Sequence, residues 1–172
     1  METLSVKLAA RMVRLGGVAA DDAKAEAMVR AALASGRGLA KFQEIIQQQA
    51  GDPGVVDDYR RLPTAPHRAL INASRSGFVG KVDAELVGRA TMVLGAGRER
   101  VDQDIDHAVG AVIVAPEGAP ITAGEPLVEV HYRDRAQLER ARELLLAAYE
   151  IADSPPASRA LVLETLDWHP AG

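Results

Sequence analysis

Two prolines, Pro63 and Pro66, separate stretches of the chain that differ in hydrophobic periodicity. Before them, apolar residues recur every three or four positions, which is the spacing of amphipathic helices. After them, short apolar runs bounded by glycine and proline alternate with helical patterns, which predicts strands and tight turns as well as helices. Because proline interrupts both helices and strand ladders, we expect a boundary here, between a helical segment at residues 1–62 and a mixed domain at residues 63–172.

The helical segment is expected to contain three helices and a shorter helical piece. A first helix over residues 4–15 ends at Gly16, and Asp21 or Asp22 is a candidate cap for the second. Residues 38–50 form the third, and residues 55–62 form the short piece. The first helix lacks a capping residue before Leu4, so we expect that the chain has been cut into at this point.

The mixed domain is expected to combine short strands with two helices. Strands are predicted at residues 67–73, 109–115, 127–130 and 161–166, and residues 77–80 form a turn or a further short strand. Asp83 is predicted to cap one helix, and Asp134 is predicted to cap a longer one that runs to about Ile151. This order predicts an α+β fold with a small mixed or antiparallel sheet, of a barrel-sandwich or hammerhead-like kind.

Composition excludes several classes of protein. The 172 residues include no cysteine, which rules out disulfides, thiolate metal sites and cysteine nucleophiles. The 20 Lys and Arg residues are scattered among 24 Asp and Glu residues, and only 3% of residues are aromatic, so neither nucleic acid nor a stacked base is expected as a ligand. No stretch is long enough to span a membrane and the first residues are unlike a secretory signal, so a soluble, cytoplasmic protein is expected.

A glycine-rich stretch and an acidic stretch are the clearest candidates for chemistry. Gly95 and Gly97 follow a predicted helix and Arg100 stands where a dinucleotide-binding fingerprint needs glycine, so they are expected to end the helix, leaving Arg98 able to meet an anion. The alternation at Asp102, Asp104 and Asp106 lacks the later ligands of a calcium loop. One or two of these carboxylates are instead expected to accept from backbone amides or to pair with Arg98 or Arg100.

No other pattern indicates an active site. The histidines lie far apart without the spacing of metal ligands, and no serine lies in a Gly-x-Ser-x-Gly turn. No pair of residues is marked out as acid and base. The residues alone therefore predict no catalytic, phosphate-binding, base-binding or metal site, and no cofactor.

The order of several motifs resembles a known family. The segments Leu94-Gly95-Ala96-Gly97-Arg98, Asp104-Ile105-Asp106-His107-Ala108-Val109-Gly110, Gly124-Glu125-Pro126-Leu127 and Val130-His131 resemble the C-terminal domain of thymidine and pyrimidine-nucleoside phosphorylases. The resemblance extends upstream through Leu62-Pro63 and Gly77-Phe78-Val79 to the helices of residues 4–50. Within it, we interpret Gly95, Gly97, Arg98, Asp104, Asp106, Gly110 and Gly124 as a structural family motif.

The resemblance implies which reaction the family catalyses, and it also implies that this chain alone does not catalyse it. In that family, phosphate attacks C1′ of a pyrimidine deoxynucleoside and releases the base and 2-deoxyribose 1-phosphate. The family's phosphate loop and base-binding residues precede everything matched here, as does the small helical domain that supplies much of its dimer contact. The resemblance therefore implies a C-terminal portion that forms a scaffold and one wall of the cleft, is inactive alone, and has the N-terminal catalytic portion as its partner.

Other interpretations stay open at the level of sequence. A freestanding carrier module resembling biotinyl or lipoyl domains would need a modifiable lysine at a hairpin tip, and no lysine follows Lys81. A naturally separate subunit that complements a catalytic chain is a second alternative. If the helices of residues 4–50 pack on absent parts, their apolar faces are exposed and the chain is expected to associate as a homo-oligomer.

Overall fold

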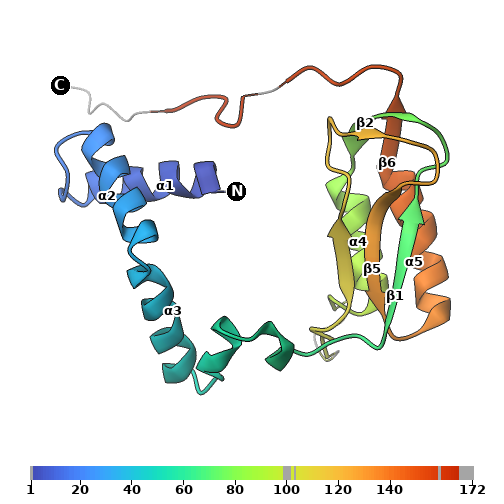
Figure 1. Cartoon of the computed structure of the whole chain (residues 1–172), viewed down its shortest axis with the longest axis horizontal. Helices are drawn as coiled ribbons and strands as arrows, with labels where there is room; N and C mark the ends of the chain where they lie inside the picture. The colour runs from blue at the N-terminus through green and yellow to red at the C-terminus, as the bar shows by residue number, and fades with distance from the viewer. Residues whose placement is uncertain (1, 99–101, 103, 159, 167–172) are drawn as a thin grey trace. The chain divides into compact units, whose positions relative to one another are not determined.

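In a computed structural model, residues 2–98, 102, 104–158 and 160–166 are described, and the chain forms two compact units (Figure 1). One unit consists of Met1–Arg61 with Arg159–Gly172, and the other of Leu62–Ser158. We call them the helical unit and the mixed unit and describe each by itself.

The helical unit contains the three predicted helices, α1 (Glu2–Leu15), α2 (Asp22–Ala34) and α3 (Arg37–Gln48), followed by the short 3-10 helices η1 (Pro53–Val56) and η2 (Tyr59–Arg61). Asp21 caps α2 by accepting a hydrogen bond from the backbone N–H of Lys24 at 2.8 Å. Val6 and Ala10 of α1 and Ala25 of α2 are buried, so small side chains let these helices approach each other. Among the described residues, no helix combines the length and apolarity that crossing a membrane requires.

The mixed unit contains two three-stranded antiparallel sheets. In the first, β5 (Pro126–Tyr132) lies between β1 (His67–Asn72) and β3 (Gly110–Ile113). In the second, β2 (Gly77–Val82) lies between β4 (Pro120–Ile121) and β6 (Tyr149–Ala152). The α+β prediction is confirmed, and the sheets in the described part of the unit do not close into a barrel.

Two helices, α4 (Ala84–Leu94) and α5 (Arg135–Ala148), pack against each other in this unit (Figure 1). Both begin at the predicted caps: the Asp83 carboxylate accepts from the N–H groups of Glu85 and Leu86, each at 3.1 Å, and the Asp134 carboxylate accepts from that of Gln137 at 2.9 Å. The core between helices and sheets is aliphatic, and its largest fully buried side chains are Ile71, Val79, Val128, Val130 and Leu145.

Two segments in the last quarter of the chain differ from the sequence prediction. Helix α5 stops at Ala148, and Tyr149 adopts an extended backbone that starts β6 instead of continuing the helix to Ile151. Residues 161–166, predicted as the last strand, form no strand. Pairing with β2 explains the first difference, because Tyr149 lies opposite Val82 and Ile151 lies opposite Val79. The last strand of the sheet is therefore β6 instead of the strand predicted at residues 161–166.

A core substitution tests the packing around α5. We expect Leu145→Ala, at a side chain with 0% exposure, to lower the free energy of unfolding by about 2–4 kcal/mol through lost burial and a residual cavity. Leu146→Ala is the matched control, because the neighbouring leucine is 44% exposed and should cost less than about 1 kcal/mol. Urea unfolding followed by circular dichroism measures both, and equal losses would contradict this packing.

Candidate functional site

The glycine motif begins where α4 ends. Gly95 is the C-cap of α4 with a φ of 105°, a left-handed conformation that glycine adopts without strain, and its N–H donates to the carbonyl of Met92 at 3.0 Å. Its own carbonyl accepts from the N–H of Asp106 at 2.9 Å. The predicted role in ending the helix is therefore present in the structure, and the same residue fastens the helix end to the segment that leads into β3.

Gly97 and Arg98 follow this cap. A Cβ added at Gly97 would lie 2.8 Å from Cγ of Met92, so the absence of a side chain allows the chain to turn back over the last turn of α4. Arg98 is exposed, and Arg100, one of the two partners expected for the aspartates, lies outside the described residues. The glycines thus shape the backbone after α4.

The Asp106 carboxylate makes polar contacts with Arg133 and with the backbone. Its Oδ2 accepts from Nε of Arg133 at 2.5 Å, and its Oδ1 accepts from the N–H of Ala108 at 3.0 Å. The Arg133 guanidinium and then this backbone N–H hold the pKa of the Asp106 carboxyl below its usual range, because both stabilise the charged form. The predicted amide contact is present, and the arginine that pairs with Asp106 here is Arg133, directly after β5.

The other aspartates and the histidines form no metal cluster in the part of the chain that the structure describes. Asp104 is exposed. The ring of His67 lies 5.3 Å from that of Tyr132, and Nε2 of His131 lies 2.8 Å from Oε1 of Glu129. Each of these histidines therefore makes a local contact with a neighbour in the first sheet, while His169 lies outside the described residues.

Gly110 and Gly124 lie at opposite ends of the first sheet. Gly110 opens β3 opposite His131, near the end of β5 that leads to Arg133. Gly124 precedes β5, has a φ of 87° in a turn closed by the N–H of Glu125 on the carbonyl of Thr122, and donates to the carbonyl of Ala73 at 2.8 Å. Because β5 separates the two, the motif residues do not converge on one pocket.

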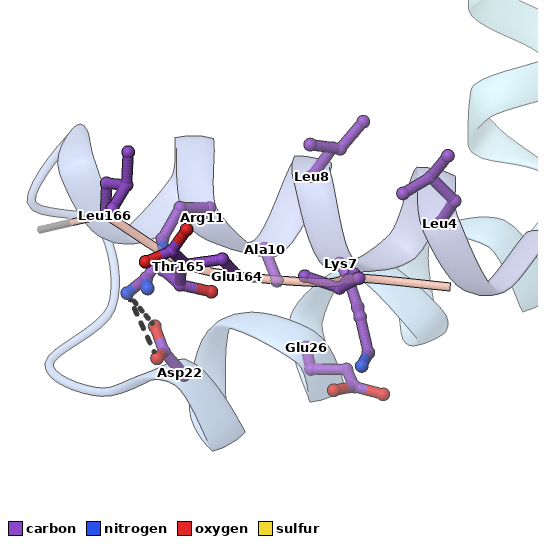
Figure 2. Close-up of a pocket in the computed structure, with 11 residues that line it drawn as sticks. Leu4, Lys7, Leu8, Ala10, Arg11, Asp22, Glu26, Glu164, Thr165 and Leu166 are labelled. Atoms are coloured by element: carbon purple, nitrogen blue, oxygen red, sulfur yellow. Dashed lines mark hydrogen bonds and ion pairs between the residues drawn. The ribbon is translucent and has the colours of Figure 1, made fainter. Parts of the chain in front are cut away.

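A pocket with a volume of about 500 Å³ lies in the helical unit instead (Figure 2). Apolar side chains of α1 and of the segment at residues 162–166 line one part, among them Leu4, Leu8 and Leu166. Lys7, Arg11, Asp22, Glu26 and Glu164 also line it. No residue of the predicted motif lies in this pocket, and no sequence pattern pointed to it because its walls come from both ends of the chain.

The charges around the pocket compensate one another. Asp22, at the start of α2, lies 3.2 Å from Nη1 of Arg11 and 3.0 Å from Nη1 of Arg14 (the Arg11 pair is drawn in Figure 2). This position also suits a carboxylate, because the N-terminal end of a helix favours negative charge. The ion pairs therefore fasten α1 to α2, which is a structural role.

The chain is similar in sequence to known proteins. Residues 78–152, from β2 to the end of β6, match the model of the pyrimidine nucleoside phosphorylase C-terminal domain. The thymidine phosphorylases of Sinorhizobium fredii and Rhizobium meliloti are each 34% identical to the chain over 167 residues, which is 96% of this chain and 38% of theirs. That of Sinorhizobium medicae is 33% identical over the same length.

The mixed unit thus contains a phosphorylase C-terminal domain, built on two small antiparallel sheets and two helices. Residues 78–152 thus match this phosphorylase domain, and along 96% of its length the chain is similar to thymidine phosphorylases. It spans 38% of the length of the curated relatives that it matches.

The contact between Asp106 and Arg133 predicts a pH-dependent stability. Because the pKa of Asp106 is lowered in the folded state, its carboxylate stabilises the fold above the pKa of about 3.9 for an unfolded aspartate, and this contribution is lost as the pH falls further. We expect Asp106→Asn to lower the free energy of unfolding by about 1 kcal/mol at pH 7.

Urea unfolding at pH 7 and at pH 3 measures this difference, which should shrink at the lower pH. Asp104→Asn is the matched control, since Asp104 is exposed two residues away and its substitution should change little at either pH. A loss of equal size for Asp106→Asn at both pH values would show that the charge of Asp106 does not stabilise the fold.

Proposed function

We propose that this chain acts as the C-terminal portion of a thymidine or pyrimidine-nucleoside phosphorylase, where it serves as a scaffold and as one wall of the substrate cleft. The reaction of the assembled enzyme is attack of phosphate at C1′ of a pyrimidine deoxynucleoside, which releases the base and 2-deoxyribose 1-phosphate. The observation that carries the proposal is the alignment at 34% identity along 96% of this chain and 38% of the relatives.

The distribution of polar groups favours a structural role for this chain over a catalytic one. Phosphorolysis requires preorganised donors around the phosphate and around the departing base, in a site shielded from water. Among the described residues, every buried side chain is apolar. The ion pair between Asp106 and Arg133 joins two segments of one fold, and the Asp106 carboxylate already has hydrogen-bond partners.

The proposal also assigns each part of the chain to a domain of the family. Residues 1–62 would belong to the large α/β domain of the family and residues 63–172 to its C-terminal domain, whose matched part is 78–152. The motif residues Gly95, Gly97, Arg98, Asp104, Asp106, Gly110 and Gly124 would serve as the framework of that domain. The partner would be the N-terminal catalytic portion of the same enzyme, in one chain or as a separate subunit.

Activity of the purified chain tests the proposal. We expect no release of thymine from thymidine and inorganic phosphate above the rate without protein, because the described residues include no buried polar side chains that could be preorganised as donors for phosphate or base. Liquid chromatography of thymine measures the rate, with the full-length Sinorhizobium fredii enzyme as positive control and circular dichroism to show that the chain is folded. Robust turnover by the folded chain would overturn the proposal.

A further inference from the structure

The chain enters and leaves the mixed unit at opposite ends of that unit. His67, which starts β1, lies opposite Tyr132, whereas Ala152, which ends β6, lies opposite Phe78, just after the turn from β1 into β2. Figure 1 shows the start of β1 and the end of β6 at these two ends. Entry and exit are therefore separated by the length of β1, which is about 20 Å for a strand of six residues.

The exit is held by Arg75, in the turn between β1 and β2. Its Nη1 lies 2.6 Å from Oδ1 of Asp153, and its Nη2 donates to the carbonyl of Ile151. Pro155 and Pro156 follow, and proline-rich connectors are extended and semi-rigid. The chain thus leaves the mixed unit from a fixed point and through a stiff connector.

Beyond this connector, the chain returns to the helical unit. Residues 160–166 belong to that unit, and four of them line its pocket beside α1 and α2 (Figure 2). We call residues 160–166 the strap. The pocket-lining residues of the strap are Val162, Glu164, Thr165 and Leu166.

The pocket separates apolar side chains of the strap from apolar side chains of α1. Leu4 and Leu8 of α1 are 37% and 59% exposed, and Val162 and Leu166 of the strap are 38% and 84% exposed. Movement of the strap into this space of about 500 Å³ would remove apolar surface of both walls from water. Such burial is favourable in proportion to the area that is covered.

The charges of the two walls favour this movement. The strap carries Glu164 and no basic residue, while α1 contributes Lys7 and Arg11 to the pocket. The acidic residues that α2 contributes, Asp22 and Glu26, already form ion pairs with arginines of the helical unit. An acidic strap therefore approaches a basic border of α1, which is attractive.

We propose that the strap closes onto α1, with Val162 and Leu166 filling the pocket, and so ties the exit end of the mixed unit to the helical unit. The strap is part of the same chain, so closure is an intramolecular step. A unit joined by one connector reorients freely unless its interface is large. A unit tied at two points about 20 Å apart turns only about the line that joins them.

Mobility of the mixed unit tests the proposed tie. We expect Val162→Lys to shorten the rotational correlation time of the mixed unit by roughly a third, because a charge facing Lys7 and Arg11 keeps the strap open and leaves one connector. Leu163→Lys is the matched control, since Leu163 is 74% exposed and does not line the pocket. Nuclear magnetic relaxation of backbone ¹⁵N measures both variants, and circular dichroism shows that they are folded.

Cross-linking tests the place of the strap without removing an apolar side chain. The chain has no cysteine, so the pair Lys7→Cys and Thr165→Cys, both in the pocket lining, creates two thiols. A short bis-maleimide should join them within one chain. The control pair is Ser5→Cys with Thr165→Cys, because Ser5 is exposed and lies about 200° around α1 from Lys7. It should react at least about fivefold more slowly, since the helix stands between the thiols.

Either of two results would overturn the proposal. Equal rates of cross-linking from Lys7→Cys and Ser5→Cys would show that the strap does not close on the pocket side of α1. An unchanged correlation time in folded Val162→Lys would show that the strap does not restrain the mixed unit. Neither measurement depends on thymidine turnover, so this proposal and the proposed function fail separately.

Discussion

The mixed unit depends on the central position of β5. This strand pairs with β1 along one edge and with β3 along the other, and it buries Leu127, Val128 and Val130. The carbonyl of Leu127 accepts from the N–H of Val114 at 2.9 Å and from the hydroxyl of Tyr149 at 3.1 Å. Because Tyr149 starts β6, the same residue ties the first sheet to the second.

The positions of the motif residues follow from this arrangement. Gly124 turns the chain into β5, and Arg133, directly after β5, holds Asp106 in the segment that enters β3. Gly95 joins that same segment to the end of α4. A glycine-rich motif of this kind serves geometry, since positive φ angles and close backbone approach are what glycine supplies. This accounts for motif residues that, in the described part of the chain, line neither of the pockets.

The two units differ in how far each covers its own apolar surface. The mixed unit surrounds an aliphatic core that the two helices and both sheets share. The helical unit buries little more than Val6, Ala10 and Ala25, and leaves large side chains exposed on α1 and α3. Burial of such surface is the main source of stability in folding and association. The mixed unit is therefore the part that buries more of its apolar side chains, and the helical unit leaves a larger share of them exposed.

The sequence by itself determined the features that arise from local interactions. The helices before Pro63, the caps at Asp83 and Asp134, and the helix end at Gly95 were all predicted, because an N-cap or a left-handed glycine acts within one turn. The order of the motifs also indicated the domain whose family model matches residues 78–152. Only the tertiary structure decided that Tyr149–Ala152 is a strand, that residues 161–166 are not, and that Arg133 holds Asp106. Those outcomes depend on partners distant in sequence, which local periodicity does not specify.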